Sequence, residues 1–146
     1  MTVGIDLSGK TALITGATRG IGKAIADAFM DCGADLMLTG TKPEEIEQMN
    51  AEEKNPKVQW LKADFSSPGC IASFIEQLKS TDVIDICVNN AGINIIKPYA
   101  EYSTDEYQRL MSINLTAPFS INQQLIPDMK KRGFGRIVNI ASIWSE

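Results

Sequence analysis

The sequence TGATRGIG, residues Thr15–Gly22, decides the fold of this chain. A short apolar run, Thr11–Thr15, precedes it, and an amphipathic run, Ile21–Cys32, follows it. Strand, glycine-rich turn and helix in this order form a phosphate site, because glycine lets the backbone approach a ligand closely and a helix N-terminus presents unpaired N–H groups. The turn therefore predicts binding of a pyrophosphate.

The glycines of this turn are spaced G-x-x-x-G-x-G, which differs from the G-x-G-x-x-G of the common dinucleotide fingerprint. Gly22-Lys23-Ala24 is similar to the end of a P-loop. However, five residues separate Gly16 from Gly22 instead of four, and Ala24 lacks the hydroxyl that binds magnesium. A plain tight turn between strand and helix is the other alternative, although three glycines are more than such a turn usually needs.

The composition is typical of one soluble domain, with 146 residues, 44% hydrophobic and 22% charged. A net charge of −4 without a long basic run disfavours nucleic acid as a partner. No apolar run could span a bilayer and the N-terminus does not resemble a signal peptide, so no membrane association is expected. The absence of histidine and the wide spacing of Cys32, Cys70 and Cys87 argue against a metal site and a disulfide framework, so a cytoplasmic location is expected.

Strand and helix patterns alternate along the whole chain. Helices are predicted from Gly20 to Cys32, from Pro43, from Pro68 with Ser67 as its N-cap, and from a Ser103–Glu106 capping box to Arg132. Strands are predicted at Thr11–Thr15, Leu36–Thr39, Val58–Ala63, Ile84–Val88 and Arg136–Ala141. This alternation predicts an α/β fold, a doubly wound parallel sheet of Rossmann type with strand order 3-2-1-4-5, and residues 1–146 as a single dinucleotide-binding domain.

Folds of this topology bind ligands at the carboxyl ends of their strands. Glycine or polar residues follow four of the predicted strands: the glycine turn, Asp64, Asn89–Gly92 and Ser142. We therefore expect these segments to form one site.

Four motifs in this order resemble the short-chain dehydrogenase/reductase family over nearly the whole chain. Thr15–Gly22 matches the family's T-G-x-x-x-G-x-G cofactor motif, and Asn89–Gly92 matches its N-N-A-G motif. Asn114 matches its helix asparagine, and Ser142 falls where the family carries its catalytic serine. The resemblance implies an oxidoreductase that moves a hydride between a nicotinamide cofactor and a small-molecule carbonyl or alcohol substrate. A 3-oxoacyl thioester is expected first and a sugar or polyol second.

The resemblance also implies a homo-oligomer, because the helix around Phe119 contributes to a dimer interface in the family. It places cofactor contacts in the glycine turn and after three further strands. The residues expected to bind the cofactor are Gly16, Thr18, Arg19, Gly20, Ile21, Gly22, Thr41, Lys42, Asp64, Phe65, Asn90, Ala91 and Gly92. Asp64 is expected to bond the adenine ring, with capping of its own turn as the alternative.

The charges around the ribose favour NADP(H) over NAD(H). An NAD site usually offers an acid about 20 residues past the glycine turn, and Thr39–Lys42 contains none. Arg19 and Lys42 instead supply two cations that suit a 2′-phosphate. The alternative is that Lys42 is a solvated surface charge.

Asn114 and Ser142 are the expected catalytic residues. Pro118 has no N–H to give the carbonyl of Asn114, so this carbonyl is left without a helical partner. The resemblance implies that it binds an ordered water of a proton relay. A simple helix kink at Pro118 is the alternative. For Ser142 the alternative is an N-cap of the next helix.

The family's reaction also needs a Tyr-x-x-x-Lys pair on the helix after the fifth strand, and this chain stops at Glu146 before such a helix. None of Tyr99, Tyr102 and Tyr107 has a lysine four residues later. We expect the chain to be the N-terminal part of a longer enzyme, inactive alone, with an exposed apolar edge at Ile137–Ile140. A short protein that binds nucleotide without catalysis, or an interaction module, is the alternative.

Overall fold

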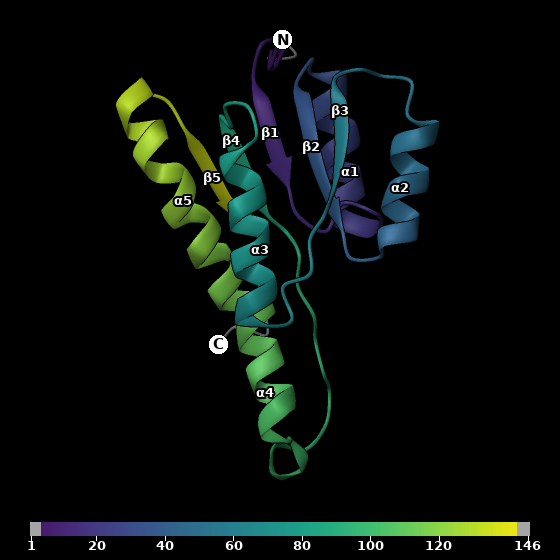
Figure 1. The fold of residues 1–146 in the computed structure, drawn as a ribbon, viewed down its shortest axis with the longest axis vertical. Coiled ribbons are helices and arrows are strands. Elements are labelled where there is room, and N and C mark those ends of the chain that lie inside the picture. Colours follow the sequence, from purple (N-terminus) through teal and green to yellow (C-terminus); the bar gives the residue numbers. More distant parts are fainter. Residues whose placement is uncertain (1–3, 143–146) are drawn as a thin grey trace.

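The computed structural model describes residues 4–142, which form a five-stranded parallel sheet (Figure 1). The strands lie in the order β3-β2-β1-β4-β5, which confirms the predicted topology. Leu13 of β1 is in register with Met37 of β2 on one side and Cys87 of β4 on the other. The bounds are β1 (Thr11–Ile14), β2 (Asp35–Gly40), β3 (Val58–Lys62), β4 (Ile86–Asn89) and β5 (Arg136–Asn139).

Helices cover both faces of this sheet (Figure 1). α1 (Gly20–Asp31) and α2 (Pro43–Glu52) lie on one face, and α3 (Pro68–Lys79) and α5 (Ala117–Arg132) lie on the other. Successive strand residues point to opposite faces, so the core divides into two clusters. Leu13 belongs to the cluster that packs with α3 and α5, whereas its neighbours Ala12 and Ile14 belong to the cluster under α1.

The two helix N-caps predicted from the sequence, at Ser67 and Ser103, are confirmed. The N–H of Cys70 donates to the Ser67 hydroxyl at the start of α3. Ser103 and Glu106 make both bonds of the capping box at the start of α4 (Thr104–Met111). Gly133 ends α5 with a φ of 70°. These caps satisfy backbone groups that a helix end otherwise leaves unpaired, so they fix where the helices begin and end.

The helical segment predicted from Ser103 to Arg132 is interrupted near Pro118. A π-helical turn at Ser112–Thr116 separates α4 from α5, and within it the N–H of Ala117 donates to the carbonyl of Ser112, five residues back. Pro118 lacks an N–H for the carbonyl of Asn114, so α-helical bonding cannot continue through this point. α4 projects beyond the sheet (Figure 1), and none of its residues is buried.

Strand limits differ from the prediction by one or two residues. β4 begins at Ile86 instead of Ile84, and β5 ends at Asn139 instead of Ala141. A 3-10 turn, Tyr99–Glu101, interrupts the segment predicted as a loop. Strand limits depend on pairing with neighbouring strands, which the periodicity of one segment does not report.

β5 lies at the edge of the sheet. Val138 and Ile140 are 43% and 38% exposed, whereas Ile137 packs against the core. In the apolar edge predicted at Ile137–Ile140, Val138 and Ile140 are therefore exposed, whereas Ile137 is not. No helix in residues 4–142 is both long and apolar enough to cross a membrane.

Candidate cofactor and active site

The segments that follow the five strands meet at the carboxyl edge of the sheet, because all five strands are parallel. The predicted site residues, except Asn114, all lie in these segments. They fall in Gly16–Gly22 after β1, Thr41–Lys42 after β2, Asp64–Phe65 after β3, Asn90–Gly92 after β4 and at Ser142 after β5. Asn114 lies in the π turn.

The glycine turn is joined to the loop after β4 by four hydrogen bonds. The N–H groups of Asn90 and Ala91 donate to the Thr15 hydroxyl at 3.0 and 2.9 Å. The side-chain amide of Asn90 donates to the carbonyls of Thr15 and Gly16, both at 3.0 Å. Thr15 is buried, so water does not compete for these bonds. The two loops predicted to hold the cofactor are therefore one hydrogen-bonded unit.

Gly22 lies where the first turn of α1 meets the glycine turn. A Cβ at Gly22 would lie 2.3 Å from the Gly16 carbonyl oxygen and 2.4 Å from Nδ2 of Asn90, so no side chain fits. Gly16 has a φ of 65°, a conformation that favours glycine. Arg19, the N-cap residue, makes no side-chain capping bond, and the first turn of α1 contains no acid. The N–H groups of this helix end are thus open to an anionic ligand.

Thr39 of β2 supports the glycine turn from the sheet. Its hydroxyl accepts from the N–H of Gly16 at 3.1 Å, and its carbonyl accepts from the N–H of Ala17 at 2.9 Å. The side chain is fully buried. Sequence reasoning missed this residue, because a threonine within an apolar strand carries no signal until the strand is placed beside the turn.

A side chain at Gly40, at the end of β2, would require the side chains of Thr18 and Ile46 to shift. A Cβ there would lie 2.5 Å from Cγ2 of Thr18 and 2.8 Å from Cδ1 of Ile46. Arg19 follows Thr18 and Lys42 lies two residues past Gly40, and both cations are exposed. Within residues 4–142 neither cation forms an ion pair or hydrogen bond through its side chain. Because Thr18 lies against Gly40, the side chains of Arg19 and Lys42 lie on neighbouring segments.

A ligand could reach the carboxylate of Asp64 and the backbone of Phe65, but not the Phe65 ring. Oδ1 of Asp64 accepts from the N–H of Ser66 at 2.9 Å, and this bond lowers the pKa of the carboxyl below its ordinary value. Asp64 is therefore ionised at neutral pH. The ring of Phe65 is buried and packs edge-on against Phe74, with ring centroids 5.3 Å apart.

A cavity of about 800 Å³ opens at the carboxyl ends of β4 and β5. It brings together the two predicted catalytic residues, Asn114 and Ser142, with the predicted cofactor residues Asn90, Ala91 and Gly92. The other predicted cofactor residues lie outside it. No charged side chain of the described residues lines this cavity, whose remaining walls are Asn89, Ile93, Asn94, Leu115, Pro118, Phe119, Asn122, Asn139, Ile140 and Ala141.

The side chain of Asn114 is fixed to the loop after β4. Its Nδ2 donates to the carbonyl of Ile93 at 2.8 Å, and its Oδ1 accepts from the N–H of Ile93 at 2.9 Å. The π turn breaks α-helical bonding at this residue, in agreement with the break expected from Pro118. The water expected on the Asn114 carbonyl stays a prediction.

Asn89 joins three elements beside the same cavity. Its side-chain amide donates to Oδ1 of Asn122 in α5 at 3.0 Å and to Oδ1 of Asn139 in β5 at 2.8 Å. These bonds hold the end of β5, from which the chain leads to Ser142. Asn122 and Asn139 could not be singled out from the sequence, because an isolated asparagine in a helix or strand forms no pattern.

Other reactive groups do not contribute to the cavity. None of the three tyrosines lines it, and the Tyr102 hydroxyl donates to the carbonyl of Ile95. Burial raises the pKa of the Cys87 thiol to about 12, so it is not a nucleophile at neutral pH. In the described part of the chain, no group of three or more His, Cys, Asp or Glu could hold a metal ion.

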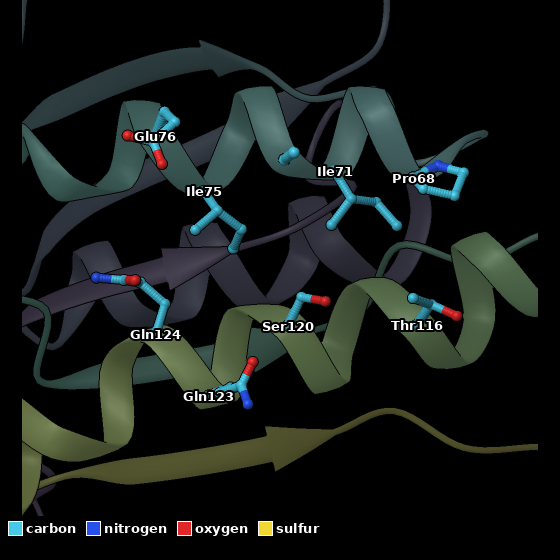
Figure 2. A pocket seen from close by; sticks show the side chains of 9 residues that line it. Pro68, Ile71, Ile75, Glu76, Thr116, Ser120, Gln123 and Gln124 are labelled. Atoms are coloured by element: carbon cyan, nitrogen blue, oxygen red, sulfur yellow. The ribbon is translucent and has the colours of Figure 1, made fainter.

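A second cavity, of about 500 Å³, lies between α3 and α5 (Figure 2). Ile71 and Ile75 of α3 face Ser120 and Gln124 of α5 across it. None of the predicted site residues lines this groove, so the candidate site remains at the carboxyl edge of the sheet.

Comparison with known proteins links this geometry to one family. Residues 10–146 match the sequence profile of the family described as short chain dehydrogenase. Over 143 residues the chain is 36% identical to a 3-oxoacyl-[acyl-carrier-protein] reductase of Aquifex aeolicus, covering 95% of this chain and 58% of that protein. The chain spans little more than half the length of the curated relatives it matches.

Solved structures show the same fold. A 3-oxoacyl (acyl-carrier-protein) reductase from Agrobacterium tumefaciens with NADP bound has a TM-score of 0.81 and 32% identity, covering 96% of this chain and 55% of that one. An L-sorbose reductase from Gluconobacter frateurii, complexed with NADPH and L-sorbose, has a TM-score of 0.83 and 30% identity, with the same coverage of 96% and 55%.

Proposed function

Because the chain belongs to the short-chain dehydrogenase family, we propose that the protein is an oxidoreductase that uses NADP(H) and acts on a carbonyl or alcohol substrate. The observation that carries this proposal is the glycine turn, which four hydrogen bonds join to the loop after β4 at the uncapped N-terminus of α1. This arrangement offers open N–H groups and a positive dipole end to a pyrophosphate.

We propose that the adenosine half of the cofactor lies over β2 and β3. Arg19, Thr41 and Lys42 would hold the 2′-phosphate, and the lack of a carboxylate in Thr39–Lys42 favours a phosphorylated ribose over a free 2′-hydroxyl. The Asp64 carboxylate and the N–H of Phe65 would bond the adenine ring. Two similar structures whose descriptions name NADP or NADPH support this choice over NAD(H).

The nicotinamide half would lie in the 800 Å³ cavity beside Asn90, Ala91 and Gly92. NADPH bound there supplies the hydride for a carbonyl carbon. Ser142 would hydrogen-bond the substrate oxygen, and the Asn114 carbonyl would hold a water that relays protons. No tyrosine of the chain lies in the cavity to act as the proton donor. We therefore propose that these 146 residues alone carry out negligible hydride transfer.

The substrate class proposed first is a 3-oxoacyl thioester, followed by a sugar or polyol. The reductases with 36% and 32% identity act on 3-oxoacyl groups by name, and the L-sorbose reductase represents the second class. The lining of the cavity, which has no charged side chain among the described residues, suits an uncharged reacting group. The proposal extends to a cytoplasmic, homo-oligomeric enzyme in which residues 1–146 form one dinucleotide-binding domain.

A nucleotide-binding or interaction module without catalysis is the second candidate. It is favoured by two observations: the loops proposed to bind the cofactor are joined by hydrogen bonds, but no tyrosine lines the cavity to donate a proton. One experiment tests the nucleotide site that both candidates share: the fluorescence of NADPH and NADH is titrated with the chain, and ketone reduction, which both candidates expect to be negligible for these residues alone, is followed in the same samples. Binding of NADPH, tighter than NADH, is expected. Failure to bind either nucleotide would overturn both candidates, and preference for NADH would overturn the NADP(H) assignment.

A further inference from the structure

Ser112 ties the loop after β3 to the π turn. Its hydroxyl donates to the backbone carbonyl of Phe65 at 2.7 Å, although the two residues are 47 positions apart in the sequence. Ser112 is 7% exposed, so water cannot readily replace this bond. The Ser112 hydroxyl therefore joins the π turn to the loop after β3, a segment that is distant from it in the sequence.

The same π turn also holds the loop after β4. Two residues beyond Ser112, the side chain of Asn114 makes its pair of bonds with the backbone of Ile93. Residues two apart on a helix point to different sides, so Ser112 and Asn114 reach in different directions. The turn thus stands between the loop proposed to bind adenine and the loop proposed to bind nicotinamide, and it holds each through one side chain.

The loop after β3 has one other backbone bond to the site, from the N–H of Ala63 to the carbonyl of Gly40 at 2.8 Å, and apart from the Ser112 bond its remaining hydrogen bonds are local. The bond from the N–H of Ser66 to Asp64 lies within the loop, and the Phe65 ring packs against Phe74 of the helix that follows. Neither contact relates the loop to the rest of the site. The Ser112 bond relates the loop to the π turn, because it fixes the carbonyl of Phe65 to the element on which Asn114 also lies.

We propose that Ser112 is a positioning residue for the adenine half of the cofactor site, acting through the carbonyl of Phe65. This inference rests on the proposed function, which places the adenine ring at Asp64 and Phe65. Ser112 does not itself touch the cofactor. Loss of its hydroxyl leaves a buried carbonyl without its partner and lets the loop move, so adenine binding weakens while the nicotinamide half, held through Asn90 and Asn114, does not.

Fragment-resolved titration of the chain tests this role. Three ligands are used: NADPH, adenosine 2′,5′-bisphosphate and reduced nicotinamide mononucleotide. Ser112→Ala is expected to weaken the first two by the same factor, about three- to tenfold, and to leave the third unchanged. Ser112→Thr keeps a hydroxyl and is expected to restore most of the affinity. Ser73→Ala is the matched control, because it removes a bond of the same kind, to the Gly69 carbonyl at 3.1 Å, from an exposed helix residue.

Hydrogen exchange of the unliganded chain provides a second measurement that does not depend on ligand affinity. Ser112→Ala is expected to speed exchange at Phe65 and Ser66 but not at Ile93. Equal loss of affinity for both halves of the cofactor, or faster exchange in both loops, would show general destabilisation and overturn the inference. Unchanged adenine binding would also overturn it. If the unaltered chain binds NADPH but Ser112→Ala behaves as the parent, the proposed function stands and this inference fails.

Discussion

Arg19 presents an exposed guanidinium at the N-terminus of α1 and makes no ion pair within residues 4–142. If it holds the 2′-phosphate, Arg19→Ala removes charge-assisted hydrogen bonds that exist only with NADPH. We predict about 10- to 100-fold weaker NADPH binding and NADH binding within about twofold, measured by fluorescence titration. Lys23→Ala is the control, because it removes the same charge from a lysine already paired with Asp27. Equal losses for the two cofactors would contradict the role of Arg19.

Gly22 tests whether the close packing of the glycine turn matters. Gly22→Ala places a Cβ against the Gly16 carbonyl and the Asn90 amide, so the turn or the loop after β4 must move. We predict a loss of about 1–3 kcal/mol in the free energy of unfolding, measured in urea, and loss of NADPH binding. At Gly69, in the first turn of α3, a Cβ meets nothing within 4 Å, so Gly69→Ala should be neutral or stabilising by up to about 1 kcal/mol. A Gly22→Ala variant that binds NADPH as the parent does would refute the proposed packing constraint.

Glu106 joins the start of α4 to Lys97, in the segment that precedes this helix. Its two carboxylate oxygens lie 2.7 and 2.5 Å from the Lys97 ammonium, and Oε2 accepts from the N–H of Ser103 at 2.9 Å. The bond to Lys97, followed by the bond to Ser103, lowers the pKa of Glu106 from 4.5 to about 2. Because the folded pKa is the lower one, this contribution to stability is complete above pH 4.5 and is lost as the pH falls through 2.

Amide exchange at Ser103 and Glu106 is therefore predicted to speed up between pH 4.5 and 2, after correction for the intrinsic pH dependence of exchange. Glu106→Gln should remove this dependence, because the amide does not titrate. Glu101→Gln, in the neighbouring 3-10 turn, removes an acid for which no such bond exists among the described residues and should leave the profile unchanged. A profile of the parent that is flat across this range would exclude the pairing.

Elements with local signals could be predicted from the sequence, and those that depend on distant contacts could not. The caps at Ser67 and Ser103 were predictable because donor and acceptor lie three residues apart. Pro118 indicated an interruption in the long helix, but not that it takes the form of a π turn. That turn is accompanied by bonds from Ser112 to Phe65 and from Asn114 to Ile93, and the sequence does not reveal either partner.

At the scale of the whole molecule, the order of the sheet was predictable because every crossover joins parallel strands through a helix. That order also gathers the predicted site residues at one edge. What it did not reveal is their division into two groups. Asn114 and Ser142 share the 800 Å³ cavity with Asn90, whereas Arg19 and Asp64 lie outside it. The split corresponds to the two halves proposed for the cofactor, and the Asn90 bonds to Thr15 and Gly16 connect these halves, as the π turn does through Ser112 and Asn114.

An apolar stripe runs along α4, the π turn and α5. It consists of Tyr107, Leu115, Phe119 and Ile126, all exposed. Phe119 and Ile126 are seven positions apart in α5, a spacing that returns to one side of a helix. Exposed apolar side chains gathered on one face of a helix favour association with a second copy of the chain. We predict that the chain associates at micromolar concentrations and that the double variant Tyr107→Glu/Ile126→Glu weakens this association at least about tenfold, measured by sedimentation velocity.

These two positions are chosen because neither lines the 800 Å³ cavity, so NADPH binding should be retained and should report correct folding. The double variant Ile5→Glu/Val83→Glu is the control, since it adds the same charge at two exposed apolar residues away from the stripe. A chain that is monomeric before any substitution would contradict the prediction. Association that survives in the stripe variant but is lost in Val138→Lys would place the contact at the edge strand β5 instead, where unpaired backbone groups and exposed apolar side chains also favour pairing.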